Sequence, residues 1–150
     1  MKDFLMKLAT TVSSSIFATM PLVIDLDEMV SETDHLLLGQ LVDVEMTNEK
    51  GEKITDPTAR TGQGLTNTIY LIINVEKVYV TVSSEVPETL KIPLDNFLHT
   101  SLAEIQDLYK DDKPKYLLLL KGDNFSPIVP GNFHRPIEEK DQILEMIKNK

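Results

Sequence analysis

Histidines are the side chains best suited to acid–base or metal chemistry near neutral pH, and this chain has three of them. His35, His99 and His134 are far apart in sequence, and none lies in an H-E-x-x-H or similar ligand pair. A metal site built from them with Asp34 is one interpretation, and ordinary hydrogen-bonding roles are the favoured one. No serine lies in G-x-S-x-G, and no carboxylate pair has the spacing of a glycosidase. The sequence therefore predicts no catalytic residue, no metal ligand and no cofactor.

Arginine is rare, with only Arg60 and Arg135 among fifteen basic residues. A guanidinium binds a carboxylate or phosphate through two parallel hydrogen bonds, so each arginine is a candidate binding residue. Arg60 lies near Asp56, and a salt bridge between them that shapes the loop is the favoured alternative. His134 and Arg135 precede the last expected helix, where they would bind an anion or, as the favoured alternative, tether the helix to the sheet.

The segment 47–68 is long, polar and punctuated by turn residues, with sequence TNEKGEKITDPTARTGQGLTNT. Gly62 and Gly64 match neither G-x-G-x-x-G nor the P-loop spacing, so a flexible turn is favoured over a phosphate-binding loop. A stretch of this length without a core pattern is either a protruding hairpin or a functional loop. Its candidate binding residues are Asp56, Arg60, Gly62 and Gly64.

The charge of the chain limits its partners. The net charge is −9, and residues 25–56 contain ten acidic residues against two lysines. Such a field repels phosphate backbones, so nucleic-acid binding is not expected. The acidic surface is either a solvated face, which is favoured, or a site for a basic protein. The absence of cysteine excludes disulfides and thiolate metal sites.

Residues 1–24 have two interpretations. The start MKDFLMK followed by an uncharged run resembles a signal peptide, although the run is rich in Ser and Thr and lacks an A-x-A cleavage site. The alternative is a structural N-terminal helix, because apolar residues recur every four positions at Phe4, Leu8, Val12, Ile16 and Met20. The run is too short and polar for a stable membrane span.

The stretch 35–46, HLLLGQLVDVEM, is the expected central strand. It is apolar on both faces at first and alternates later, which predicts burial on two faces and then on one. Gly39 inside it predicts a bulge, a bend or a close backbone approach. A short helix capped by Asp25 precedes the strand, with Glu28 in a capping-box-like position.

Four further strands and two helices follow. Residues 69–80 alternate with an expected bulge near Glu76-Lys77, 89–94 form an edge strand, and 116–120 form a buried strand. A hairpin turn at 121–124 leads into a strand at 125–129. A capping box at Ser101 starts a helix whose apolar face is Leu102, Ile105, Leu108 and Tyr109, and a terminal helix covers 136–149. This order predicts a mainly β (α+β) protein, a five-stranded OB-like barrel with a helix between strands 3 and 4, and residues 25–150 as one domain.

The pieces LDEMVSETDHLLLGQLVDVE, INVEKVYV, VPETLKI and KYLLLLKG resemble a group of small, mostly exported bacterial proteins of uncharacterised activity. The resemblance implies an OB-like barrel similar to netrin modules and tissue inhibitors of metalloproteinases. It also implies a periplasmic or secreted location over a cytoplasmic one. Those inhibitors act through a disulfide-anchored N-terminus, which this chain cannot form, so the resemblance implies no site residue.

Three functions remain open from the sequence. The favoured one is a non-enzymatic binding module that contacts a protein through the 47–68 loop, with His134 and Arg135 as further binding candidates. A metal-dependent or other hydrolase centred on His99 or His134 is the second. A structural accessory domain is the third.

Overall fold

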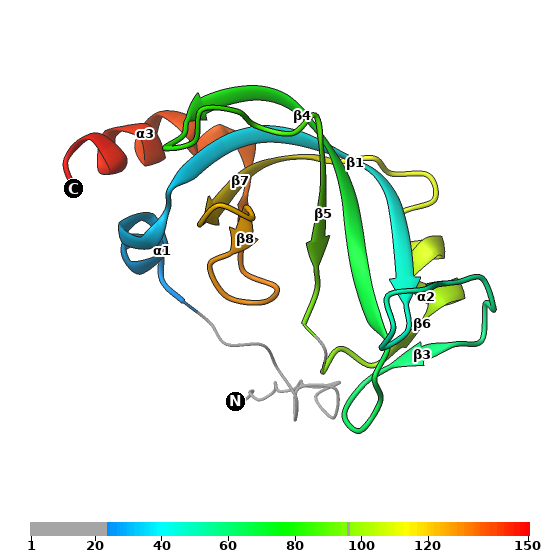
Figure 1. The fold of residues 1–150 in the computed structure, drawn as a ribbon. Coiled ribbons are helices and arrows are strands. Elements are labelled where there is room, and N and C mark those ends of the chain that lie inside the picture. Colours follow the sequence, from blue (N-terminus) through cyan, green and yellow to red (C-terminus); the bar gives the residue numbers. More distant parts are fainter. Residues whose placement is uncertain (1–23, 96) are drawn as a thin grey trace, which may run out of the picture.

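The computed structural model describes residues 24–95 and 97–150 (Figure 1). The longer strands are β1 (His35–Thr47), β4 (Thr68–Val80), β5 (Thr89–Pro93) and β7 (Lys115–Lys121). The two-residue strands are β2 (Lys53–Ile54), β3 (Arg60–Thr61), β6 (Thr100–Ser101), β8 (Ser126–Pro127) and β9 (His134–Arg135). The helices are α1 (Leu26–Glu32), α2 (Leu102–Leu108) and α3 (Lys140–Lys148), the last after the 3-10 turn η4 (Ile137–Glu139). The predicted mainly β class is confirmed.

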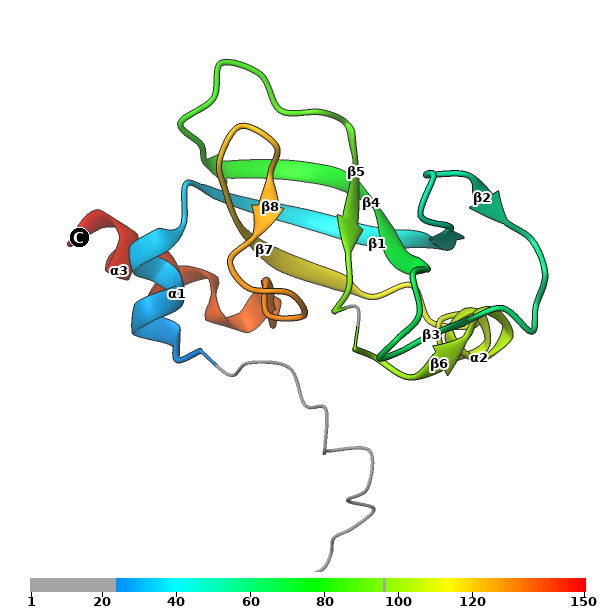
Figure 2. The same ribbon diagram turned by 60° about the horizontal axis from the view of Figure 1, so that its bottom comes forward.

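A large antiparallel sheet dominates the structure. Its main path has the order β5-β4-β1-β7-β8, with β2 added on β1 and β9 on β7, which makes seven strands. A separate small sheet joins β3 to β6. Within the described residues no ladder connects the outer strands β5 and β8. Figures 1 and 2 show β1 and β4 as long curved ribbons, with α1 and α3 at one end and α2, β3 and β6 at the other.

The expected central strand is confirmed as β1, which pairs with β4 on one side and with β7 on the other. Gly39 permits the close packing there, because a Cβ at this position would lie 2.5 Å from Ile73 Cγ2 and 2.9 Å from Leu118 Cδ1. The register shifts beside it, since Leu38 pairs with Lys77 while Gly39 pairs with Val75. This shift places the extra residue at Glu76 and confirms the predicted bulge.

Two apolar cores lie on opposite faces of the sheet. On β7, Leu118 and Leu120 pack in the core with α2, while Leu117 and Leu119 pack in the core with α1 and α3. Burial on both faces explains why this strand is a continuous run of leucines rather than an alternation. The predicted buried strand is therefore confirmed.

Helix starts follow their sequence signals. Asp25 accepts a hydrogen bond from the backbone N–H of Glu28 at 2.9 Å, and Ser101 forms a complete capping box with Glu104. The predicted apolar face of α2 is wrong at Leu108, which is 64% exposed. A seven-residue helix has room to bury only one narrow stripe, here Leu102 and Ile105.

Two boundaries at the C-terminal side differ from expectation. The predicted strand 125–129 shortens to Ser126–Pro127, because Phe125 has a φ of 53° and belongs to the turn. The predicted terminal helix 136–149 divides into the 3-10 turn η4 and the helix α3. Two hydrogen bonds from Arg135 hold Glu139, the last residue of that turn, beside β9.

The two interpretations of the N-terminal segment concern residues that, apart from Ile24, lie outside the described part of the chain. In residues 24–95 and 97–150, none of the helices has the length and apolar character needed to span a bilayer.

Candidate functional site

The long loop 47–68 is docked on the rest of the protein rather than protruding freely. β2 forms a hairpin with β1, and β3 pairs with β6 immediately before α2 (Figure 2). The backbone N–H groups of Leu102 and Ala103 donate to the carbonyl oxygens of Ala59 and Pro57 at 2.8 and 3.0 Å. The loop therefore satisfies two of the free donors at the start of α2, which fixes its position.

Asp56 and Arg60 do not form the predicted salt bridge. The Asp56 carboxylate accepts hydrogen bonds from the Thr58 N–H at 2.9 Å and the Thr58 hydroxyl at 2.8 Å, which closes an Asx turn. These bonds lower the pKa of Asp56 below its usual value. Arg60 instead lies 3.4 Å from Glu104 on α2. The prediction failed because the nearest carboxylate in space comes from the next helix, which sequence spacing does not reveal.

Gly62 and Gly64 have different roles. A Cβ on Gly62 would lie 2.6 Å from His99 Nδ1, so the His99 ring packs directly on this backbone. Gly64 has a φ of 84° with no atom within 4 Å of the place a Cβ would take, and it supplies only the turn conformation. Thr61 beside them is buried, and its hydroxyl donates to the Leu98 carbonyl at 2.6 Å. These contacts join the loop firmly to residues 98–99.

Three exposed apolar residues lie within a few positions of this junction along the chain, and we call them the apolar tip: Leu65, Phe97 and Leu98. They are 51%, 52% and 39% exposed. Leu65 closes a turn with the carbonyl of Gly62, and Leu98 lies one residue from His99, so the contact of His99 with Gly62 holds the two segments together. Isolated exposed apolar residues are ordinary, but three at one junction mark a candidate interaction surface. Sequence reasoning selected the loop and missed Phe97 and Leu98.

His134 and Arg135 form a structural tether. Arg135 binds Glu139 through two hydrogen bonds, from Nε at 2.8 Å and Nη2 at 2.9 Å, so its guanidinium holds η4 against β9. The His134 ring stacks on Tyr116 with centroids 4.4 Å apart. Desolvation of that ring, and secondly the charge of Arg135, lower the pKa of His134 below 6.5. These contacts fit the tethering alternative, because the guanidinium of Arg135 is already paired with the carboxylate of Glu139.

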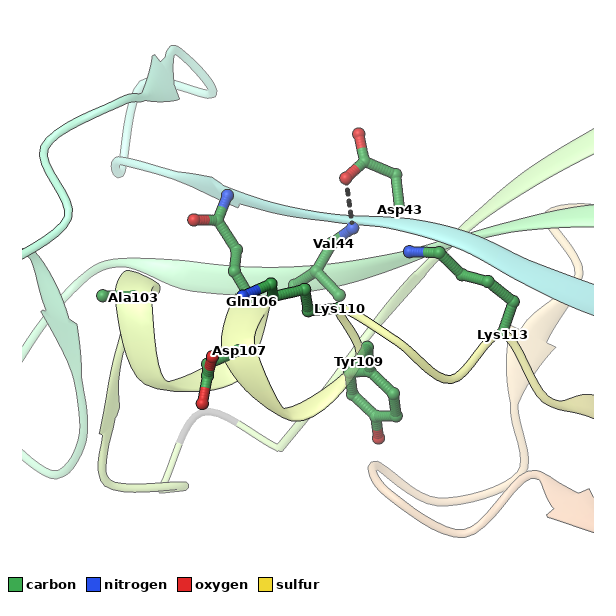
Figure 3. Close-up of a pocket in the computed structure, with 8 residues that line it drawn as sticks. All are labelled: Asp43, Val44, Ala103, Gln106, Asp107, Tyr109, Lys110 and Lys113. Carbon is green, nitrogen blue, oxygen red and sulfur yellow. Dashed lines mark hydrogen bonds between the residues drawn. The ribbon is translucent and has the colours of Figure 1, made fainter.

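An open hollow of about 430 Å³ lies between α2 and β1 (Figure 3). Figure 3 shows Gln106 and Lys113 reaching toward β1, while the Asp107 carboxylate points away from it. Two aspartates and two lysines are among its lining residues, so it has no net preference for an anion or a cation: Asp43, Val44, Ala103, Gln106, Asp107, Tyr109, Lys110 and Lys113. It is a weaker candidate than the apolar tip.

Two tyrosines near this hollow remain protonated at neutral pH. Burial and the charge of Asp112 raise the pKa of Tyr109. Burial, followed by the charges of Tyr109 and Asp112, raises the pKa of Tyr116. Neither phenol is therefore activated as a base.

The structure assigns the three histidines to separate surroundings. His99 lies on Gly62, His134 stacks on Tyr116, and His35 packs against Phe125 with ring centroids 4.2 Å apart. Across the described segments of the chain, no group of three or more His, Asp or Glu side chains has the arrangement of a metal site.

His35 is fully buried and connects three segments. Its Nε2 lies 2.8 Å from the Gly122 carbonyl oxygen, which can only accept, so Nε2 carries the hydrogen. In the neutral ring, Nδ1 then accepts a hydrogen bond from the Thr81 hydroxyl at 2.8 Å. The neighbouring Asp34 carboxylate accepts the Gly122 N–H at 2.8 Å. We call this group the His35 cluster: Asp34, His35, Thr81, Gly122 and Phe125.

Comparison with known proteins found no match among protein families, curated proteins or solved structures. Function is therefore inferred from the geometry of the described residues.

Proposed function

We propose that this protein is a non-enzymatic binding module that holds another protein against the apolar tip and the adjoining 47–68 loop. The observation that carries the proposal is the exposure of Leu65, Phe97 and Leu98 at one junction whose backbone is firmly bonded. A surface whose apolar side chains are exposed while its backbone is rigid loses little conformational entropy on binding. A hydrolase centred on His99 or His134 has no support of this kind, since the His99 ring packs on Gly62 and the His134 ring stacks on Tyr116.

The fold that we propose for this module is an OB-like barrel. Two features support this proposal: the strand order β5-β4-β1-β7-β8 and the position of α2 between β5 and β7 in the chain. The Cα atoms of β5 and β8 also approach to within 8 Å, although no ladder between them is present among the described residues. A curved, well-packed sheet of this kind would hold the tip rigidly at one end.

Point substitutions test the proposal better than removal of the loop. Deletion of residues 53–62 would eliminate β2, β3 and the carbonyl groups that bind the start of α2. A photo-crosslinking phenylalanine analogue at Phe97 preserves the aromatic ring at the tip. The same analogue at Val82 is the matched control. Val82 is an exposed apolar residue (72%), and it follows the end of β4 that is opposite to the end preceded by Leu65.

We expect the analogue at position 97, irradiated in cells, to form a defined crosslinked species that the analogue at position 82 does not form. The substitutions Leu65→Ser and Leu98→Ser in the same chain should abolish that species. Identical products from both positions, or products insensitive to the serine substitutions, would contradict the proposal. A purely structural domain predicts that contrary result.

A further inference from the structure

Within the His35 cluster, a hydroxyl group is paired with a histidine that can accept its proton. The Thr81 hydroxyl donates to Nδ1 of His35 at 2.8 Å, and the opposite ring nitrogen, Nε2, donates to the Gly122 carbonyl oxygen at 2.8 Å. This second bond fixes the tautomer, so the ring presents an unprotonated Nδ1 to the hydroxyl. A hydroxyl bonded to a neutral imidazole that a third group orients is the arrangement by which proteins activate a hydroxyl as a nucleophile.

The base in this pair is held rigidly and is shielded from solvent. His35 is fully buried at the start of β1, and the Phe125 ring lies against it with centroids 4.2 Å apart. Because His35 has no solvent-accessible surface, bulk water does not compete with Thr81 for Nδ1. A base within hydrogen-bond reach of the proton that it removes meets the geometric requirement of general-base catalysis.

Polar groups on both sides of the pair support transfer of the proton. The Ser83 N–H donates to Oγ1 of Thr81 at 3.1 Å, and this bond stabilises the negative charge that develops there as the proton leaves. On the side of the ring, the Asp34 carboxylate accepts the Gly122 N–H at 2.8 Å, so a negative charge lies on the turn that binds Nε2. This charge favours the imidazolium that the transfer produces.

The nucleophilic atom belongs to the accessible member of the pair. Thr81 is half-buried, whereas His35 is fully buried. Thr81 directly follows the last residue of β4 and precedes Val82, which is 72% exposed. An electrophile therefore approaches the hydroxyl from the solvent side, while the base behind it stays dry.

We propose that Thr81 is a nucleophile activated by His35, and that it takes the acyl group of an activated carboxylic ester. Oγ1 of Thr81 bonds to the carbonyl carbon as its proton passes to Nδ1 of His35. The bond from that carbon to the leaving oxygen then breaks, and the imidazolium returns the proton to the departing alcohol. The products are an ester of Thr81, the free alcohol and the neutral ring. An activated ester is the class of donor, because its leaving group departs with the help of one weak acid.

This reaction goes beyond the proposed binding function and does not depend on the apolar tip. The test incubates the full chain with p-nitrophenyl acetate and follows acetylation of each residue by peptide mass spectrometry. Ser84 is the internal control, because its hydroxyl is exposed in the same connection between β4 and β5. We expect Thr81 to be acetylated about a hundredfold faster than Ser84, which is the lower range of general-base catalysis. Urea that unfolds the chain should remove the difference, because it separates Thr81 from His35.

Variants divide the roles of the two residues. His35→Gln retains a donor for the Gly122 carbonyl and removes the base, so acetylation of Thr81 should fall to the rate of Ser84. Thr81→Ser retains the hydroxyl and should still react at position 81. His99→Gln is the matched control, and it should leave acetylation of Thr81 unchanged.

Three outcomes would overturn the inference. They are equal rates at Thr81 and Ser84 in the native chain, a difference that persists in urea, and an unchanged rate in His35→Gln that circular dichroism shows to be folded. If His35→Gln does not fold, the native chain with and without urea decides between the outcomes.

Discussion

The two ends of β4 have opposite characters. Beyond Val80, Thr81 belongs to the His35 cluster, where a fully buried ring uses both nitrogens and the neighbouring carboxylate holds the same turn. Before Thr68, Leu65 joins Phe97 and Leu98 in an exposed apolar group. At the first end, polar groups are buried and satisfied, which stabilises the fold. At the second end, three exposed apolar residues lie close in the chain to the contacts that join the loop to residues 98–99, which is consistent with binding, whereas the exposed Val82 at the first end follows Thr81 of the His35 cluster.

The largest expected effect concerns the His35 cluster. His35→Ala removes two hydrogen bonds and the ring contact with Phe125, and leaves a cavity, so the free energy of unfolding should fall by about 3 kcal/mol. His35→Gln should lose less, because its amide can still donate toward the Gly122 carbonyl. Urea denaturation measures both variants, with His99→Ala as a control that should change stability by less than about 1 kcal/mol. Equal losses of unfolding free energy for His35→Ala and His99→Ala would contradict the special contribution of the His35 cluster to stability.

A smaller loss of stability is expected when Lys150, which bonds to the C-terminal end of α1, is replaced. The Lys150 ammonium donates to the carbonyl oxygens of Thr33 at 2.6 Å and Val30 at 3.0 Å, which belong to the C-terminal end of α1. Lys150→Met should therefore lower stability by about 1 kcal/mol, because carbonyls near a helix C-terminus lose a cationic donor. Hydrogen exchange should accelerate in α1. Lys148→Met on α3 is the control, and similar exchange in both variants would refute the role of Lys150.

At the apolar tip we expect a small change in stability. Phe97→Ser and Leu98→Ser remove side chains that are 52% and 39% exposed, so the free energy of unfolding should fall by about 1 kcal/mol or less for each. Thermal and urea unfolding test this directly. A loss near that of His35→Ala would mean that the tip serves packing, and would remove the contrast between the two ends.

The smallest expected effect is the pH dependence of stability that His134 contributes, and this residue belongs to neither of the two groups at the ends of β4. Its native pKa is below 6.5, so the unfolded chain binds more protons as the pH falls through 6.5, and this residue's contribution to stability decreases there. Arg135→Gln removes one cause, so the pKa of His134 should rise toward 6.5. NMR titration of the ring protons measures it. An unchanged or lower pKa would show that Arg135 does not contribute.

Prediction from sequence succeeded where the cause was local. Asp25 and Ser101 cap their helices as expected, because an N-cap bonds to an N–H three residues away in the chain. The bulge at Glu76 was also visible, since the apolar residues change parity there. The loop was recognised as a candidate site from its polarity, but the partner of Arg60 and the two exposed residues Phe97 and Leu98 were not.

The sequence by itself determined the mainly β class, the central strand, the doubly buried β7 and the starts of α1 and α2, because periodicity and capping act over a few residues. Only the tertiary structure decided which carboxylate Arg60 meets, that His99 packs on Gly62, and that the Thr61 hydroxyl bonds to the Leu98 carbonyl. These contacts join segments more than thirty residues apart, as in the 37-residue separation of Thr61 and Leu98. Their geometry depends on the pairing of β3 with β6, and periodicity or capping signals over a few residues do not predict that pairing.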